Sequence, residues 1–348
     1  MEDISKVDPR LVVQSYIGKP DVRFFAIDEP PFKLHGAFRE GECYRRVPEA
    51  VSNALNSRAK KFSTATAGAR VRFKTNSAYV AIRAHLGEIY RVPMLTLTSC
   101  CGFDLYEGES FLGSFNPPYE IQNGGVYEAV INLGERRWRE LTVNMPMYSS
   151  VIDLWVGVDG EAELSAPNEY SVSSPVVFYG SSITHGACAS RPGMTFSAML
   201  SRRLDCDYIN LGFGAGCRGD LRLAEYIGGL RAGALVCAYD HNAPNPEKLK
   251  ETHKDFYEAV RKTDKSLPII FVSRPETAWS EDGEKRRNII KETYLFAREL
   301  GDNSVYFIDG RELLPSADQT HDGIHPNDLG QESIAKGLYN ILDKILNP

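Results

Sequence analysis

The sequence predicts an α/β protein in which an antiparallel β-sandwich precedes a three-layer α/β/α domain built on a parallel sheet. Two observations predict this fold. Residues 40–160 carry short apolar runs with a period of two, which is the period of a half-buried strand. From about residue 175, short buried runs alternate with longer stretches of helical period, which indicates a parallel sheet with helices on both faces.

The first part of the chain is predicted to form short antiparallel strands. Apolar and polar residues alternate in four clear runs: residues 80–86, 127–133, 141–145 and 152–158. The turn sequences KTNS, EGES, QNGG and NLGE separate such runs, and strands at this spacing are typical of a sandwich. Residues 47–60 are expected to include a short helix.

The second part is predicted to alternate strands and helices. Five short apolar runs have the composition of buried strands: residues 176–179, 208–211, 235–239, 269–272 and 305–308. Helical periodicity lies between them, as in residues 249–260 and 290–297. The polar, proline-bounded segment 165–175 separates the two parts, so we expect one domain in residues 1–170 and a second in residues 171–348.

Composition argues against several classes of function. The formal net charge of -6 disfavours a nucleic-acid surface, which needs a basic face. No run approaches the roughly 18 apolar residues of a membrane span, and the first ten residues lack a signal-peptide pattern. The seven cysteines include no Cys-x-x-Cys pair, so we expect reduced thiols, no metal site and a cytoplasmic protein. The alternative is a secreted or periplasmic protein whose signal peptide has been removed.

The segment GSSITHG, residues 180–186, follows the first predicted strand of the parallel sheet. Ligands of open α/β sheets bind at the carboxyl ends of the strands, so Ser181 and Ser182 stand where a ligand would be. Gly180 and Gly186 bracket the turn, and backbone N–H groups at the following helix could stabilise an oxyanion beside such a hydroxyl. The alternative is that both serines only cap that helix.

The segment THDGIHPND, residues 320–328, supplies a candidate base. It follows the last predicted strand, so His325 is expected at the same sheet edge as Ser182. A carboxylate three residues earlier, Asp322, can bind one ring nitrogen while the other faces the serine, as in a Ser-His-Asp triad. Two alternatives stay open: ordinary turn chemistry, and a metal pair with His321, which the intervening glycine disfavours.

Two more segments offer hydrogen-bond donors to the same edge. INLGFGAGCRGD, residues 209–220, is a glycine-rich turn after the second strand, and Asn242 lies in AYDHNAPN after the third. Their backbone and amide N–H groups are expected beside Ser182, where each oxyanion donor contributes about 2.7–4 kcal/mol. Alternatively, Asn242 only forms an Asx turn.

Four blocks, in this order, resemble the SGNH or GDSL superfamily of serine esterases and acylhydrolases: YGSSITHGACASRPGM, NLGFGAGCRGD, YDHNAP and DGIHPND. They lie within residues 176–328, which is most of the second domain. GFDLYEG, residues 102–108, is similar to the Gly-x-Asp-Leu-Tyr signature of the sandwich domain that precedes the catalytic domain in bacterial acetylhydrolase-like proteins. The resemblance implies a jelly-roll-like sandwich followed by a flavodoxin-like hydrolase domain.

The resemblance also implies roles for the candidate residues. Ser182 would be the nucleophile, His325 the general base and Asp322 the carboxylate that orients the imidazole. Oxyanion donors are implied at the N–H of Ser182, in the second block at residues 214–215, and at the amide of Asn242.

Three positions depart from the family pattern. Ser181 stands where the family has an Asp before the nucleophile, which removes a charge beside the serine. Ala215, flanked by Gly214 and Gly216, stands at the second-block glycine, and the backbone N–H of Gly214 or of Ala215 can serve as the donor. The third block reads DHNA, residues 240–243, where the family has Gly-x-Asn-Asp.

We therefore expect a serine esterase that cleaves short-chain, acetyl esters of small molecules or saccharides without a cofactor. Two alternatives stay open. One is a glycan-binding protein whose hydrolase domain is degenerate and inactive. The other is a dinucleotide-binding oxidoreductase, because GAGCRG at residues 214–219 matches G-x-G-x-x-G and Asp240 follows about twenty residues later. Oligomeric state is left open, and Trp279 and Tyr239 are expected to pack in the core rather than to stack on a sugar.

Overall fold

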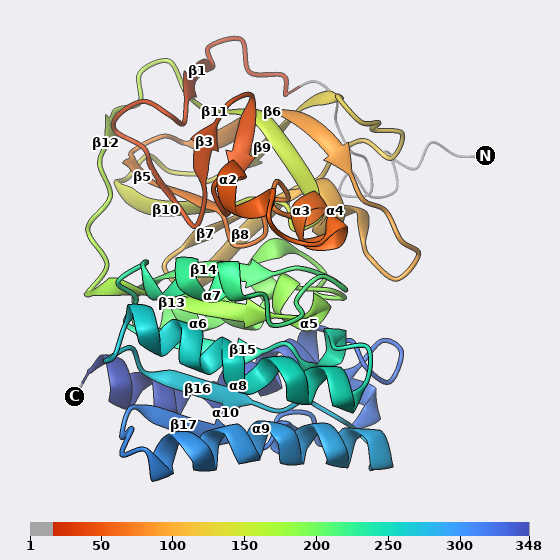
Figure 1. The fold of residues 1–348 in the computed structure, drawn as a ribbon. Helices are drawn as coiled ribbons and strands as arrows, with labels where there is room; N and C mark the ends of the chain where they lie inside the picture. The colour runs from red at the N-terminus through yellow and green to blue at the C-terminus, as the bar shows by residue number, and fades with distance from the viewer. Residues whose placement is uncertain (1–16, 348) are drawn as a thin grey trace.

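The computed structural model describes residues 17–347, and its architecture confirms the predicted fold class (Figure 1). Two larger antiparallel sheets occupy residues 23–165, and a five-stranded parallel sheet occupies residues 172–308. We call these two parts the sandwich and the parallel-sheet region. Figure 1 shows them stacked, with the sandwich at the top of the view.

The strands of the sandwich form two sheets and one separate pair. Their bounds are β1 Arg23–Ala26, β2 Lys33–His35, β3 Phe38–Glu40, β4 Cys43–Arg45, β5 Arg70–Thr75, β6 Tyr79–Ile89, β7 Phe103–Glu107, β8 Ser110–Phe115, β9 Val126–Asn132, β10 Arg139–Asn144, β11 Ser149–Val158 and β12 Leu164–Ser165. One sheet has the order β1-β11-β6-β9, and the other has the order β12-β5-β10-β7-β8 with β2 also beside β5. All neighbours in these sheets are antiparallel, as are β3 and β4.

The alternation of apolar and polar residues in the sequence determines which side chains enter the sandwich core. In β6, the side chains of Val80, Ile82 and Leu86 are fully buried. Arg83 and His85, which point to the opposite face, are partly exposed. Over residues 82–86, period-two alternation therefore separates a core face from a partly exposed face, whereas Ala81 is buried on that second face as well.

The helix expected within residues 47–60 is split in two, α2 Glu49–Ser52 and α3 Ser57–Phe62. The side chain of Asn56 starts α3 by accepting the N–H of Ala59 at 3.2 Å. A third short helix, α4 Leu97–Cys101, leads into β7.

The parallel-sheet region alternates strands and helices, and each of the five predicted strands is confirmed. Its elements are β13 Val172–Gly180, α5 Ser182–His185, α6 Phe196–Leu204, β14 Cys206–Gly212, α7 Leu221–Gly228, β15 Ala234–Ala238, α8 Pro246–Thr263, β16 Ile269–Val272, α9 Glu281–Glu299, β17 Val305–Ile308 and α10 Asp328–Leu346. The strand order is β14-β13-β15-β16-β17, with β14 on the side nearest the sandwich (Figure 1). Among residues 17–347, no helix is both long and apolar enough to cross a membrane.

Helices cover both faces of the parallel sheet. On one face, Phe178 of β13 shares a buried cluster with Phe196 of α6 and Leu338 of α10. On the other face, Tyr179 stacks on Phe256 of α8 with 4.7 Å between the ring centroids. Because neighbouring residues of β13 are buried on opposite faces, the strand is a continuous apolar run in the sequence. The cluster around Tyr179 continues into the sandwich, so the two parts share one core.

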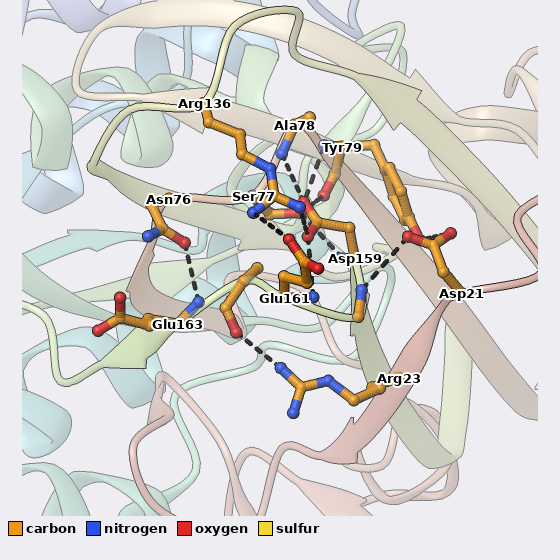
Figure 2. Close-up of polar contacts among 12 residues, drawn as sticks. Asp21, Arg23, Asn76, Ser77, Ala78, Tyr79, Arg136, Asp159, Glu161 and Glu163 are labelled. Carbon is orange, nitrogen blue, oxygen red and sulfur yellow. Dashed lines mark hydrogen bonds and ion pairs between the residues drawn. The ribbon is translucent and has the colours of Figure 1, made fainter.

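A polar cluster lies between the turn that joins β5 to β6 and the residues that follow β11 (Figure 2). The carboxylate of Asp159 accepts the hydroxyl of Ser77 at 3.0 Å and forms an ion pair with Arg136. Nearby, the side chain of Asn76 accepts the N–H of Glu163 at 2.8 Å. These contacts hold the turn between β5 and β6 against the segment that joins β11 to β12.

A second set of polar contacts joins the two parts. Asp207 of β14 forms an ion pair with the buried Arg70 of β5, and its Oδ2 lies 3.0 Å from Nδ1 of His35 in β2. Burial alone would raise the pKa of Asp207, but Arg70 and His35 outweigh it and lower the pKa to about 2. The expected domain boundary between residues 170 and 171 falls in the segment between β12 and β13 and stays a prediction.

Candidate active site

Ser182 lies at the tip of β13, where the strand ends at Gly180. A side chain at Gly180 would place its Cβ 2.1 Å from the hydroxyl of Thr184, so the turn into α5 requires a glycine there. The hydroxyl of Ser181 caps α5 by accepting the N–H of Ile183 at 3.2 Å. Capping therefore uses Ser181 and leaves the hydroxyl of Ser182 available.

The imidazole of His325 joins Ser182 to Asp322. Oγ of Ser182 lies 2.9 Å from Nε2 of His325, and Nδ1 of His325 lies 2.8 Å from Oδ2 of Asp322. Because an ionised carboxylate only accepts hydrogen bonds, Nδ1 carries the proton of the neutral ring and Nε2 accepts the hydroxyl of Ser182. The structure thus brings together residues that are 143 positions apart in the sequence.

The carboxylate of Asp322 is held by its own loop. Its Oδ1 accepts the backbone N–H of His325 at 2.8 Å and that of Ile324 at 3.0 Å. Partial burial raises the pKa of Asp322, but the N–H groups and the imidazole of His325 outweigh it and bring the pKa to about 2. The carboxylate is therefore ionised at neutral pH and can orient His325 and stabilise an imidazolium.

The turn of residues 213–216, which follows β14, gives the two predicted second-block donors different surroundings. The N–H of Gly216 donates to the carbonyl of Phe213 at 2.7 Å, and Ala215 has a φ of 59°, as the third residue of a type II turn requires. The N–H of Gly214 donates to Nδ1 of His185 at 3.3 Å. The N–H of Ala215 contacts no acceptor within residues 17–347, so it is the unoccupied one of the two predicted second-block donors.

Asn242 is oriented by a backbone contact. Its Oδ1 accepts the N–H of Cys217 at 3.2 Å, which leaves Nδ2 as the end available to a ligand. Asn242, Ala215, Ser182 and His325 all line one cavity of about 380 Å³. The structure therefore brings the predicted donors and the predicted triad residues to the same edge of the parallel sheet.

The sandwich supplies most of the apolar wall of this cavity. The residues that line the cavity from the sandwich are Arg58, Phe62, Tyr90, Val92, Met94, Leu95 and Tyr148. From the parallel-sheet region, His241, Arg274 and Ile324 complete the wall. Sequence reasoning missed the residues from the sandwich, because the apolar stretch at residues 90–95 carries no periodicity that distinguishes a cavity wall from ordinary packing.

Asp240, which the dinucleotide alternative assigns to a ribose, is buried and bound to backbone groups. Its carboxylate accepts the N–H of Arg274 at 2.8 Å and that of His241 at 3.0 Å, and burial raises its pKa to about 6. The metal-pair alternative would need a free ring nitrogen on His325, and both of its ring nitrogens contact other side chains, Ser182 and Asp322. Residues 17–347 contain no group of three or more His, Cys, Asp or Glu side chains that could hold a metal ion.

Both parts of the chain match known family models. Residues 173–343 match the GDSL-like lipase/acylhydrolase family. Residues 22–164 match a second model, GxDLY, described as the N-terminus of Esterase SGNH hydro-type. A comparison with curated proteins found no match.

Solved structures share the whole fold. A protein from Bacteroides ovatus described as a GDSL-like lipase is 28% identical, with a TM-score of 0.84 over 93% of this chain and 98% of that chain. A salicylyl-acyltransferase from a tetracycline biosynthetic pathway is 18% identical, with a TM-score of 0.77 over 91% and 96% of the two chains. An acetyl xylan esterase from the rumen bacterium Butyrivibrio proteoclasticus is 13% identical, with a TM-score of 0.61 over 93% and 98%. The last two likenesses show the fold alone.

Proposed function

Residues 173–343 belong to the GDSL-like lipase/acylhydrolase family, and we propose that this chain hydrolyses carboxylic esters with a triad of Ser182, His325 and Asp322. The observation that carries the proposal is the distance of 2.9 Å between Oγ of Ser182 and Nε2 of His325, with Asp322 bound to the other ring nitrogen. A serine hydroxyl needs such a base to attack an ester at neutral pH.

In the proposed reaction, Oγ of Ser182 attacks the ester carbonyl while Nε2 of His325 takes its proton. Asp322 keeps the ring proton on Nδ1 before the attack and stabilises the imidazolium that forms. The imidazolium then protonates the leaving alcohol. Water repeats the sequence on the acyl-enzyme, with His325 again acting as the base.

Three donors are proposed for the tetrahedral oxyanion: the N–H of Ser182, the N–H of Ala215 and Nδ2 of Asn242. Neither of the two backbone N–H groups contacts an acceptor in the described residues, and Oδ1 of Asn242 is already occupied. Gly214 is not assigned this role, because its N–H donates to His185. Donors that are oriented in advance contribute about 2.7–4 kcal/mol each to transition-state stabilisation.

An acetyl group is the proposed acyl part. A methyl group added at Gly214 would lie 3.6 Å from Cβ of Ser182, and 3.8 Å from ring atoms of Phe62 and His185. One methyl group therefore makes ordinary contacts in the space beside the nucleophile, and the methyl of an acetyl ester would fit it. The shared fold with an acetyl xylan esterase supports the same acyl group and a saccharide as the alcohol. The rest of the cavity leaves room for that alcohol.

Fluorophosphonate labelling and hydrolysis of p-nitrophenyl acetate test the proposal. The wild-type protein should be labelled and should release p-nitrophenol, and Ser182→Ala should lose both while its unfolding temperature is unchanged. Ser114→Ala, in β8 and outside the cavity, is the matched control and should behave as the wild type. Hydrolysis that survives Ser182→Ala would overturn the nucleophile assignment. Oligosaccharide binding by a wild-type protein with neither labelling nor hydrolysis would favour the glycan-binding alternative.

A further inference from the structure

The sandwich contacts the turn that carries one of the proposed oxyanion donors. We call residues 213–216 the oxyanion turn. Figure 1 shows α3 on the side of the sandwich that faces the parallel-sheet region. Three side chains connect the sandwich to the oxyanion turn or to the strand end before it: Asn56, Arg46 and His185.

Asn56 binds the end of the oxyanion turn. Its Nδ2 donates to the carbonyl of Gly216 at 2.7 Å, while its Oδ1 caps α3 through the N–H of Ala59. A Cβ at Gly216 would lie 2.7 Å from the backbone nitrogen of Ala59, so the turn and α3 are in direct backbone contact. One amide side chain therefore fixes both the start of α3 and the end of the turn.

Arg46 binds the strand end that leads into the oxyanion turn. Its guanidinium donates from Nη1 to the carbonyls of Asn210 at 2.9 Å and Gly212 at 2.8 Å, and from Nη2 to the carbonyl of Phe62 at 2.6 Å. It also lies over the ring of Phe213, 4.6 Å from the centroid. The side chain is 1% exposed and forms no ion pair within residues 17–347. Burying a charge without a counter-ion is unfavourable. Here the guanidinium donates hydrogen bonds to three backbone carbonyls, which offset part of that cost.

His185 connects the start of the oxyanion turn to the sandwich. Its Nε2 lies 2.7 Å from the carbonyl of Met147, and because a carbonyl only accepts, the ring proton is on Nε2. Nδ1 is then the acceptor for the N–H of Gly214 at 3.3 Å. The buried ring stacks on Tyr148 with 4.2 Å between the centroids. Burial and the charge of Arg46 lower the pKa of His185, so the ring stays neutral and Nδ1 remains an acceptor.

We propose that His185, Asn56 and Arg46 are positioning residues through which the sandwich fixes the oxyanion turn, so that the N–H of Ala215 is directed at the reacting carbonyl oxygen. This inference rests on the proposed function, since it assumes that the turn binds the oxyanion. It gives the sandwich a role in the chemical step besides lining the cavity. Because the contact acts on the transition state, its loss should lower kcat and leave KM nearly unchanged.

Four variants separate positioning from folding. Asn56→Ser keeps a capping hydroxyl for α3 but is too short to reach Gly216. His185→Phe keeps an aromatic ring and loses both hydrogen bonds, whereas His185→Gln keeps one donor and one acceptor. Asn76→Ser is the matched control, because Asn76 also accepts a backbone N–H but lies in the cluster of Figure 2.

Steady-state kinetics on p-nitrophenyl acetate and hydrogen–deuterium exchange of residues 211–219 are measured on the same preparations. We expect Asn56→Ser and His185→Phe to lower kcat about 10- to 100-fold, to leave KM within about twofold, and to speed exchange in this segment. His185→Gln should recover most of kcat and of the protection, and Asn76→Ser should match the wild type.

Two results would overturn the inference: unchanged exchange in both variants, or faster exchange with unchanged kcat. If His185→Phe does not fold, Asn56→Ser decides the question by the same two readouts. Activity that survives Ser182→Ala would instead show that the proposed function is wrong. Hydrogen–deuterium exchange does not depend on catalytic activity. Failure of the positioning inference can therefore be distinguished from failure of the proposed function.

Discussion

The backbone N–H of Cys217 donates to Oδ1 of Asn242 at 3.2 Å. This contact joins the loop after β14 to the loop after β15, and it determines which end of the amide remains free beside Ser182. With Oδ1 occupied, Asn242 can act on a ligand only as a donor through Nδ2. The orientation of this side chain can therefore be tested by changing its donor and keeping its shape.

Asn242→Asp is expected to lower activity more than Asn242→Ala. The Asp variant keeps an oxygen for the N–H of Cys217 but replaces the donor by a negative charge beside the developing oxyanion. We expect kcat on p-nitrophenyl acetate to fall about 10²–10³-fold in Asn242→Ala, which loses the donor together with the acceptor for Cys217 and adds no charge, and further in Asn242→Asp. Stopped assays of p-nitrophenyl acetate hydrolysis, on purified variants whose unfolding temperature is unchanged, test this prediction. A kcat within threefold of the wild-type value in both variants would contradict the assignment of Asn242 as an oxyanion donor.

Asp322→Asn is expected to lower kcat about 10⁴-fold at pH 7, because it reverses the tautomer of His325. The backbone N–H groups of His325 and Ile324 hold Oδ1, so an amide at position 322 would turn its Nδ2 toward Nδ1 of the ring. That nitrogen would then have to accept, and the proton would move to the nitrogen that faces Ser182.

The pH profile adds a second check on Asp322. Its pKa of about 2 means that the carboxylate stays ionised throughout the range from pH 5 to pH 9. Protonation of Asp322 should therefore contribute no acid limb to the wild-type kcat profile in that range. A loss below about tenfold in Asp322→Asn at every pH would contradict an orienting role.

Local sequence patterns predicted the fold where one physical cause dominates. The strands at residues 176–179 and 269–272 are buried on both faces, so their apolar runs are unambiguous. The split of the helix within residues 47–60 was not predictable in the same way. Asn56 caps the N-terminus of α3. The same side chain contacts Gly216, which is 160 positions away in the sequence, and no local pattern encodes a contact at that separation.

The same distinction applies to the site. Asp322 and His325 are three residues apart after the last strand, so a local pattern was enough to propose their contact. The cavity wall at Phe62 depends on how the sandwich packs on the parallel-sheet region, and no local pattern encodes it. The prediction that Trp279 packs in the core is wrong, since its side chain is 70% exposed, whereas the same prediction for Tyr239 is confirmed at 1%. Tyr239 directly follows β15, but Trp279 lies in a loop without periodicity.

Asp207→Asn is expected to destabilise the protein in a pH-dependent way. The pKa of Asp207 is about 2 in the folded protein and ordinarily 3.8, so its charge stabilises the folded state above about pH 4, and this stabilisation is lost as the pH falls toward 2. The shift corresponds to about 2 kcal/mol, and the variant also leaves the buried Arg70 without its partner. Urea unfolding should show a free energy lower by at least about 2 kcal/mol at pH 7 and a smaller difference at pH 3.

A surface pair provides the control for Asp207. Asp153 pairs with Arg39 at 2.9 Å, and both side chains are about one-third exposed. Asp153→Asn should therefore change the free energy of unfolding by less than about 1 kcal/mol. A difference between wild type and Asp207→Asn that does not narrow on acidification would show that the Asp207–Arg70 pair is not the source of the loss.

Gly214→Ala is expected to act on the acyl group of the substrate and not on the fold. The added methyl would make contacts of 3.6–3.8 Å with Ser182, His185 and Phe62, and the backbone of Gly214 lies outside the left-handed region. Such a substitution commonly stabilises a protein by about 0.4–1 kcal/mol. It would occupy the space proposed for the methyl of an acetyl ester, so kcat/KM for phenyl acetate should fall at least about tenfold.

Phenyl formate separates this steric effect from damage to the chemistry. Its acyl carbon carries hydrogen where acetate carries a methyl group, so Gly214→Ala should hydrolyse it within about threefold of the wild-type rate. An equal loss on both esters would mean that the added methyl disturbs the nucleophile or the oxyanion donors. Unchanged activity on both would place the acyl group elsewhere in the cavity, and the acetyl assignment would then lose its structural support. Only selective loss on acetate is consistent with an acyl site that ends beside Gly214.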